Sequence, residues 1–155
     1  MTPESMVVLR QFRVLFNAVK SHFQYMEKQA GIGGAQLWAL SVVAERDGLG
    51  VSELAQAMDV HQSTASNLVR ALVGKGLLVS QRDEPDRRAV RLSVTRDGAA
   101  LLRTVPGPWA GVLPEALQQL DAATLARLHA DLGALIQTLG EDAASPSAQT
   151  PLAEM

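Results

Sequence analysis

Apolar residues near the start of the chain follow the period of a helix. They recur at alternating spacings of three and four residues, which is typical of a seam that packs on another helix: Leu9, Phe12, Phe16, Val19, Phe23 and Met26. This pattern predicts one long helix over residues 5–29, and "GIGG" at 31–34 ends it. A helix this long beside a small domain is expected to pack on more than its own chain.

Three shorter helical patterns follow. "AQLWALSVVAER" (35–46) is strongly apolar and predicts a central core helix. Ser52 is a good N-cap for a short helix in "ELAQAMDV", and after the turn "DVHQ" a third helix in "STASNLVRALVGKG" is closed by Gly74 and Gly76. Two short helices joined by a tight turn are typical of a helix-turn-helix.

The third of these helices has two distinct faces. One face is expected to be buried and the other is polar, because the residues of each set fall at helical spacings. The buried set is Ala65, Leu68, Val69 and Leu72, and the polar set is Ser63, Ser66, Asn67 and Arg70.

Two strand-like segments come next. They are "LLVSQR" (77–82) and "AVRLSVT" (89–95). The second segment alternates apolar Val90, Leu92 and Val94 with polar neighbours. Pro85-Asp86 supplies turn chemistry between them, and Thr95 is the expected N-cap of a helix in "RDGAALLRTV". A helix-turn-helix followed by a two-stranded wing predicts a winged helix-turn-helix over residues 34–95.

The C-terminal third repeats the pattern of the N-terminus. Prolines 106, 108 and 114 predict a kink or an interruption, and Asp121 is the expected N-cap of a last helix. That helix again carries leucines at spacings of three and four: Leu125, Leu128, Leu132, Leu135 and Leu139. We expect residues 141–155, which are small, polar and proline-bearing, to be disordered.

These elements predict a mainly α fold with a small antiparallel β-wing, in one domain over residues 1–140. The winged helix-turn-helix of residues 34–95 is flanked by expected dimerisation helices at 5–29 and 115–140.

Composition narrows the class of protein. The sequence has no cysteine, which excludes disulfides and thiolate metal sites. Its start lacks the features of a signal peptide, and no apolar run approaches the ~20 residues that span a bilayer. We therefore expect a soluble cytoplasmic protein with no membrane partner.

Charge is distributed unevenly along the chain. Residues 61–96 contain seven basic and three acidic residues, a net charge of +4, so the rest of the chain carries −6. Four of the arginines lie in "QRDEPDRRAVRLSVT" (81–95), which is interpreted either as a solvated hairpin or as a cationic finger for a polyanion. A basic segment on an acidic body is typical of a surface that meets phosphate.

The run from "GLGVSELAQAMDVHQSTASNLVRAL" through the wing "RDEPDRRAVRLSVTRDG" closely resembles the MarR-type bacterial transcriptional regulators, with motif-level similarity over about residues 34–102. The resemblance implies a homodimer whose N- and C-terminal helices interlock. It also implies two winged domains on successive major grooves of a pseudo-palindromic operator, ~10 base pairs apart centre to centre. We expect a sequence-specific regulator of transcription that acts as a repressor.

The expected DNA contacts fall in the recognition helix and the wing. Asn, Gln and Arg can each make paired hydrogen bonds to a base, while wing arginines bind phosphates or enter the minor groove. Arg88 aligns with the family's wing-tip arginine, and we expect Asp83 and Asp86 to shape the wing by pairing with arginines. The full set of expected contacts is His61, Gln62, Ser63, Thr64, Ser66, Asn67, Arg70, Arg82, Arg87, Arg88 and Arg91.

The resemblance also implies a small aromatic effector, a phenol or aromatic carboxylate, that releases the protein from DNA. It would bind between the dimerisation helices and the winged domain. Core packing or solvation is the alternative for each candidate lining residue: Arg10, Arg13, Asn17, His22, Tyr25, Trp38 and Trp109.

Catalysis finds no support in the sequence. His22, His61 and His129 lie on different elements without metal-ligand spacing, and no glycine-rich phosphate cradle follows a strand. We expect no catalytic residue, metal or cofactor. The alternatives to a ligand-released repressor are a winged helix used as a protein-interaction module and a regulator without an effector.

Overall fold

The computed structural model describes residues 1–82, 89–140 and 147–155. Its first element is the long helix α1 (Pro3–Ala30), which contains the expected range of 5–29. The Thr2 side chain accepts a hydrogen bond from Ser5 N, and Gly31 ends the helix in the left-handed conformation with φ 72°. Gly31, the first glycine of "GIGG", therefore ends the helix where the sequence predicts.

A three-helix core follows α1. Helices α2 (Gly34–Glu45), α3 (Val51–Met58) and α4 (Gln62–Gly74) pack on one another through a shared apolar cluster. Leu40, Leu54 and Leu72 in this cluster are fully buried. The helix-turn-helix is therefore held by its own core, as the apolar faces of the three sequence patterns indicate.

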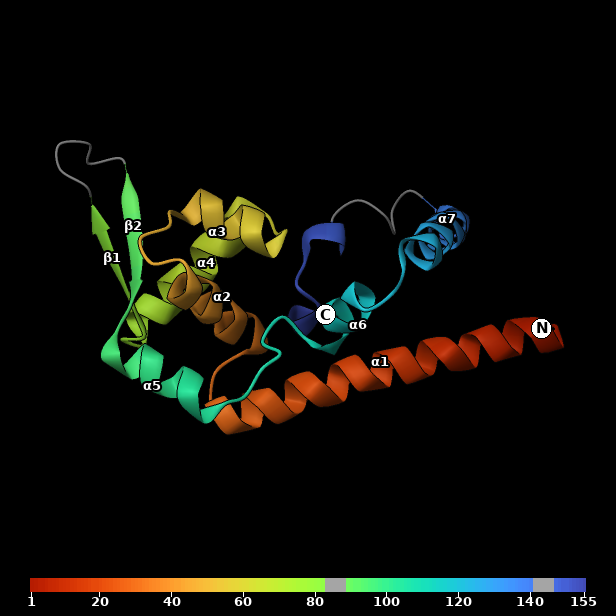
Figure 1. The fold of residues 1–155 in the computed structure, drawn as a ribbon, viewed down its shortest axis with the longest axis horizontal. Coiled ribbons are helices and arrows are strands. Elements are labelled where there is room, and N and C mark those ends of the chain that lie inside the picture. Colours follow the sequence, from red (N-terminus) through yellow and green to blue (C-terminus); the bar gives the residue numbers. More distant parts are fainter. Residues whose placement is uncertain (83–88, 141–146) are drawn as a thin grey trace.

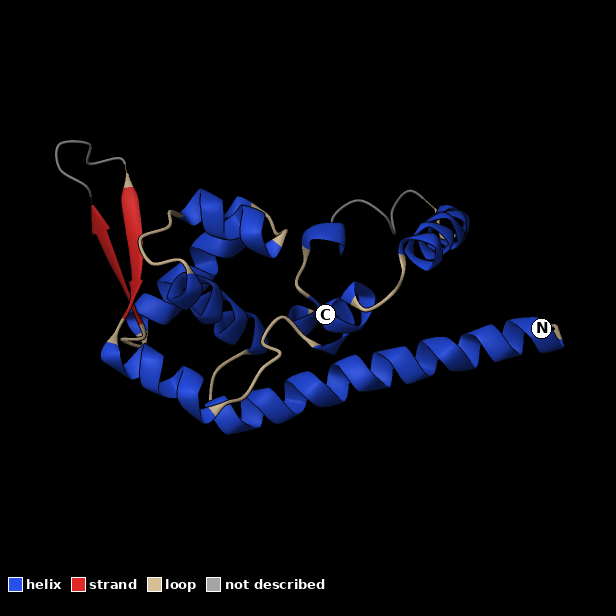
Figure 2. Ribbon diagram, in the orientation of Figure 1, coloured by secondary structure: helices blue, strands red, loops and turns tan. Residues whose placement is uncertain are grey.

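The wing is a two-stranded antiparallel sheet. Strand β1 (Leu78–Arg82) pairs with β2 (Val90–Val94) in a register that runs from Leu78 opposite Val94 to Arg82 opposite Val90. Figure 2 shows the strands at one end of the molecule, beside the helical core. Residues 83–88, which include Asp83, Asp86, Arg87 and Arg88, lie outside the described residues.

The loop before α3 adds a short third pairing to the wing. Leu92 N donates to Leu49 O at 2.9 Å, and Gly48 N donates to Leu92 O at 2.8 Å. The prediction of Ser52 as N-cap is wrong, because α3 begins at Val51 with Gly50 as its N-cap. Pairing with β2 positions the chain up to Leu49, and the Gly50 N–H is satisfied by Glu53 Oε1 at 3.2 Å.

Helix α5 (Arg96–Thr104) leaves the wing through a tight junction. The Thr95 hydroxyl accepts from Gly98 N and donates to Gly76 O, which confirms Thr95 as the N-cap. A Cβ on Gly98 would collide with Leu77 O and with the side chain of Val94. Only glycine lets this helix approach the start of β1 so closely.

The proline-rich segment separates α5 from the last two helices, α6 (Val112–Gln118) and α7 (Ala122–Thr138). Asp121 caps α7 as expected, since its side chain accepts from Thr124 N at 2.9 Å. Hydrogen bonds from Thr124 hold the pKa of the Asp121 carboxyl below its ordinary value of 3.8. The predicted interruption and the predicted start of the last helix are both confirmed.

The two terminal helices expose apolar side chains. Figure 1 shows α1 running away from the winged core, with α7 near the distal half of α1. Only Phe23 and Met26 of α1 are buried, whereas Phe16 is 68% exposed and Val14 is 64% exposed. No residue of α7 is buried, and Leu139, its C-cap, is 66% exposed.

The end of the chain folds back onto the core. We expected residues 141–155 to be disordered, but the described part forms two short 3-10 turns, η1 (Ser147–Gln149) and η2 (Leu152–Glu154). Pro151 is buried, and Ala153 packs against the apolar core. A small and polar composition predicts disorder only where the segment has no apolar side chain that docks on the core. Here a few apolar side chains of the segment dock.

Candidate nucleic-acid interface

The polar stripe of α4 faces outward because the opposite face is the core. Ala65 and Leu72 are fully buried, and Leu68 and Val69 are less than 10% exposed. At helical spacing this orientation turns the other stripe to the surface, where Ser63, Asn67 and Arg70 are exposed and Ser66 is half-buried. The structure therefore brings these four expected residues together on one face.

Asn67 and Arg70 are linked on that face. Arg70 Nη1 donates to Asn67 Oδ1 at 3.1 Å, one turn apart. The hydrogen bond orients both side chains while the Asn67 amide retains its donor group. An adenine or guanine edge offers partners to groups of this kind.

The N-terminal end of α4 is open. His61 is its N-cap residue but makes no side-chain capping hydrogen bond, as expected of a neutral histidine. His61 and Gln62 are exposed, and Thr64 is half-buried. The helix N-terminus thus presents polar side chains and backbone N–H groups, an arrangement that suits an anion such as phosphate.

The wing places two of its arginines at its surface. Arg82 ends β1 and is exposed, and Arg91 on β2 pairs in register with Gln81. The Arg91 guanidinium lies near Gly48, with Nη1 3.9 Å from the position that a Cβ on Gly48 would take. Arg91 is thus next to the loop that joins α2 to α3.

Helix α4 and the wing are fixed relative to one another. α4 contacts β1, and Leu77 N donates to Leu72 O across the turn between them. Lys75, at the end of α4, donates to Gln36 of α2 at 2.7 Å. The polar stripe and the wing are therefore two parts of one rigid surface.

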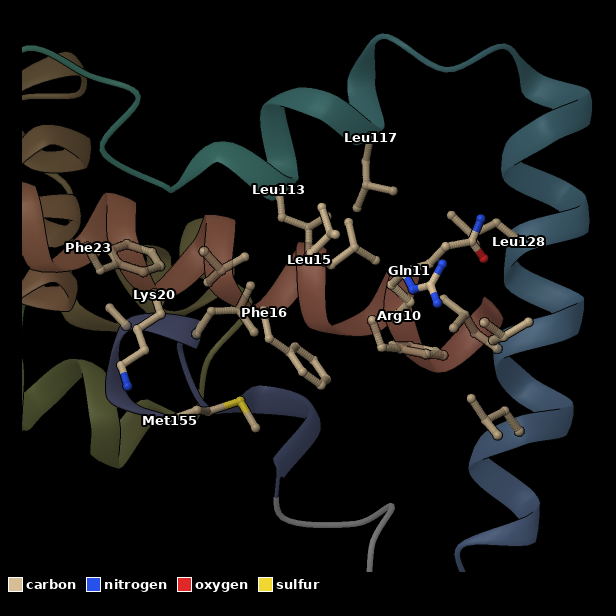
Figure 3. Close-up of a pocket in the computed structure, with 18 of the residues that line it drawn as sticks. Arg10, Gln11, Leu15, Phe16, Lys20, Phe23, Leu113, Leu117, Leu128 and Met155 are labelled. Carbon is tan, nitrogen blue, oxygen red and sulfur yellow. The ribbon is translucent and has the colours of Figure 1, made fainter. Parts of the chain in front are cut away.

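A large groove of about 1320 Å³ runs along α1 and reaches Phe23 and Glu27, next to the start of α2. Figure 3 shows its walls: α1 with Leu15, Phe16 and Arg10, α6 with Leu113 and Leu117, and α7 with Leu128. Of the seven residues expected to bind an effector, Arg10 lines this groove. Leu152 and Met155 of the chain's end also line it, which the sequence did not predict because that segment was expected to be disordered.

A second, smaller cavity of about 290 Å³ lies at the junction of α1, α2 and α3. Trp38 lines it together with Phe23 and Met58. Arg13, Asn17 and Tyr25 line neither cavity and are exposed.

His22 and Trp109 hold the segment between α5 and α6. A nitrogen of the His22 ring, Nε2, lies 2.9 Å from Pro108 O, and Trp109 Nε1 donates to Val105 O at 2.9 Å. Both side chains are half-buried. The seven expected residues are therefore not gathered in one pocket: Arg10 and Trp38 line two different cavities, His22 and Trp109 lie at an interhelical joint, and the other three are on the exposed surface.

Within residues 1–82, 89–140 and 147–155, no three histidine or acidic side chains are arranged to hold a metal ion. No helix in the same part of the chain has the length and apolar character needed to cross a membrane.

Comparisons with known proteins agree with this architecture. Residues 30–89 match the model of the MarR family. The HTH-type transcriptional repressor MdtR of Bacillus subtilis is 33% identical over 87 residues, which is 56% of this chain and 56% of MdtR. The HTH-type transcriptional regulator Hpr of Bacillus cytotoxicus is 29% identical over 90 residues, 58% of this chain and 49% of Hpr. The matched region thus spans about half the length of these relatives.

A solved structure extends the likeness to the whole fold. The S. aureus MepR–DNA complex superposes with a TM-score of 0.57 at 21% identity, over 90% of this chain and 99% of that chain. The similarity therefore includes the terminal helices as well as the winged core.

Proposed function

Because the chain belongs to the MarR family of winged helix-turn-helix transcriptional regulators, we propose that it binds duplex DNA sequence-specifically and represses transcription. The observation that carries the proposal is the polar stripe of α4, which the buried opposite face turns outward beside an arginine-bearing wing. The relatives support it, since MdtR is a repressor and MepR has been solved on DNA.

In this proposal α4 lies in the major groove. Asn67 and Arg70 are the candidates for base contacts, because each can make paired hydrogen bonds to a purine. His61, Gln62, Ser63, Thr64 and Ser66 lie nearer the start of the helix and bind either phosphates or bases.

The wing supplies the sequence-independent contacts. In this proposal Arg82 and Arg91 bind phosphates, and Arg87 and Arg88 bind phosphates or enter the minor groove. We further propose that Asp83 and Asp86 pair with wing arginines and fix the shape of the hairpin. The charge of +4 over residues 61–96 is what such a surface requires.

We propose that the protein acts as a homodimer. The support is the apolar surface that one chain leaves uncovered on α1 and α7, including Phe16, Val14 and Leu139. Exposed apolar area of this kind marks an interface. A two-fold dimer places two α4 helices on half-sites of a pseudo-palindrome, ~10 base pairs apart centre to centre.

We also propose that a small aromatic acid or phenol releases the protein from DNA. The junction between α1 and the winged core offers a cavity with Trp38 in its wall, which can take an aromatic ring, and Arg10 in the large groove beside α1 is a separate candidate partner for a carboxylate. Arg13, Asn17, His22, Tyr25 and Trp109 remain candidates for a rearranged bound state.

DNA binding is tested by fluorescence anisotropy. Purified protein is titrated against the fragment upstream of its own gene and against a scrambled fragment, at several salt concentrations. We expect tight, salt-steep binding that prefers the native fragment. Equal, weak binding to both fragments would favour the alternative, a winged helix used in protein interactions.

The effector is tested on the same complex. Benzoate and 4-hydroxybenzoate are added, with cyclohexanecarboxylate as a control that keeps the carboxylate and removes the aromatic ring. We expect release with the aromatic acids alone. DNA binding that none of them changes would favour a regulator without an aromatic effector.

A further inference from the structure

The last residues of the chain occupy a site rather than merely lying on the surface. Figure 1 shows the segment near the label C, between α1 and the helices of the winged core. Pro151 is buried, and Ala153 packs against both apolar clusters, the one within the winged core and the one that joins α1 to α2. Residues 150–155, the tail segment, therefore bridge two parts of the fold.

The start of α2 is shaped to receive the tail segment. A Cβ on Gly34 would lie 2.8 Å from Phe23 Cδ1 and 3.0 Å from the Ala153 Cβ. Both distances are shorter than ordinary van der Waals contacts, so the missing side chain makes the room that Phe23 and Ala153 fill. Glu27 holds the same point, since its Oε1 accepts from Gly34 N at 2.9 Å.

The tail segment also forms a wall of both cavities. Leu152, Ala153 and Met155 line the large groove beside α1, and Thr150, Pro151 and Leu152 line the small cavity that contains Trp38. Figure 3 shows Met155 at the edge of the large groove, near Lys20. A molecule that enters the junction between α1 and α2 must therefore contact or displace these residues.

The attachment is built to be reversible. The backbone N–H groups of Glu154 and Met155 bond within the segment, to Pro151 O and Leu152 O. Leu152 is 39% exposed and Met155 is 78% exposed, so burial falls mainly on Pro151 and Ala153. One buried side chain, Pro151, and one half-buried side chain, Ala153, make a weak contact, which a tethered segment can afford because its effective concentration is on the order of millimolar.

We propose that the place where Phe23 of α1 meets Gly34 of α2, between the large groove and the small cavity, is a binding site for a short apolar peptide, and that the tail segment is its resident ligand. Occupancy holds α1 against the winged core, and an apolar molecule enters the junction only by displacing the tail segment. The coupling of occupancy to DNA affinity rests on the proposed function. The peptide site itself does not.

The test is binding in trans. A chain that ends at Gln149 is titrated with a labelled peptide of residues 147–155, SAQTPLAEM, and binding is followed by anisotropy without DNA. We expect the shortened chain to bind with a dissociation constant of about 0.1 mM or tighter, and the full chain to bind at least tenfold more weakly, because its own tail segment competes at an effective concentration on the order of 1 mM. A control peptide carries Ala153→Asp and should not bind.

Two results would overturn the site: no binding to a shortened chain that circular dichroism shows to be folded, or equal binding to both chains.

If the shortened chain fails to fold, the full chain with Ala153→Asp replaces it. Gln149→Asp, which adds the same charge at an exposed position, is its matched control. We expect Ala153→Asp to shift Trp38 emission to the red and to admit the peptide, in a Trp109→Phe background that leaves Trp38 as the sole tryptophan. Unchanged emission and no peptide binding would refute the proposal.

The coupling is read separately. We expect DNA affinity to fall by about 5- to 150-fold when the tail segment is absent, the usual range of coupling between sites. Added peptide should restore it. Peptide binding without any DNA binding by the full chain would support the peptide site and reject the proposed function. DNA binding with no peptide binding would reject the peptide site and support the proposed function.

Discussion

The winged core and the terminal helices use similar apolar residues in opposite ways. Leu40, Leu54 and Leu72 are fully buried within the core of a single chain. Phe16 and Leu139 follow the same helical spacing, yet each is about two-thirds exposed. Apolar periodicity therefore identifies a helix face that must be covered, but it does not show whether the same chain or a second chain covers it.

The largest effect is expected from a charge placed on the exposed apolar face of α1. Phe16→Asp places a charge in the proposed interface and should weaken the dimer by about 3 kcal/mol or more, roughly 100-fold or more in dissociation constant. Sedimentation velocity measures the change. Ala18→Asp adds the same charge outside the apolar seam of α1 and should leave the dimer intact.

A stable dimer of the Phe16→Asp variant would mean that α1 does not form the interface. A variant that also loses the helical signal of the winged core would mean that the two regions are not separable. The expected result is a monomer whose core remains folded.

Two glycines, one in the packed core and one on the open helix α7, should respond oppositely to the same substitution. Gly98→Ala should destabilise the fold by about 1–3 kcal/mol, because its Cβ meets Leu77 O and Val94. Gly133→Ala on α7 should stabilise it by about 0.5–1 kcal/mol, since nothing lies within 4 Å and alanine favours the helix. Urea unfolding at one fixed protein concentration measures both, and equal effects would contradict the distinction between a packed and an open region.

The third prediction concerns the DNA-facing side of the core. Arg70→Ala should reduce affinity for the preferred fragment by about 1–3 kcal/mol and relax its preference over the scrambled one. Arg127→Ala, on α7 and far from the wing, is the matched control and should change neither. Loss of preference in the control would place the DNA surface elsewhere.

Arg88 provides a smaller and less specific effect. Arg88→Ala should weaken binding to both fragments alike and reduce the slope of log affinity against log salt by about one, as the loss of a backbone contact does. Thermal unfolding should be unchanged. An unaltered DNA affinity would remove Arg88 from the interface.

The smallest effect is a pH dependence of α7. Because the pKa of Asp121 is lowered in the folded chain, its carboxylate stabilises α7 at neutral pH. That stability is lost as the pH falls from the ordinary value of 3.8 through the lowered pKa. Asp121→Asn keeps a capping side chain that does not titrate, so its helical signal should depend less on pH over this interval. Identical acid profiles for the two chains would contradict this role.

Much of the winged core could be predicted from sequence because local signals and tertiary packing agree there. Thr95 caps the helix that was assigned to it, and the alternation of Val90, Leu92 and Val94 identifies β2. Ser52 was misassigned because the start of α3 is set by a non-local pairing, Leu49 with Leu92, that no local pattern reveals. The polar face of α4 followed directly from its buried face.

The effector residues and the tail segment were harder to predict. Whether His22 and Trp109 line a pocket or brace a loop depends on where Pro108 and Val105 carbonyls lie, which helical spacing does not encode. The tail segment was misjudged because its docking depends on space left by Gly34, more than a hundred residues away. Contacts of this range carry no signature in local composition.

One experiment tests whether α4 and the wing bind DNA while a second chain covers α1 and α7. It is hydrogen exchange on the protein with its preferred DNA fragment, at high and low protein concentration. We predict that DNA protects residues 62–70 and the wing. We also predict that dilution exposes the distal half of α1 and α7 while α2 to α4 stay protected. Protection by DNA outside α4 and the wing, or a single cooperative loss of protection over the whole chain on dilution, would contradict the account.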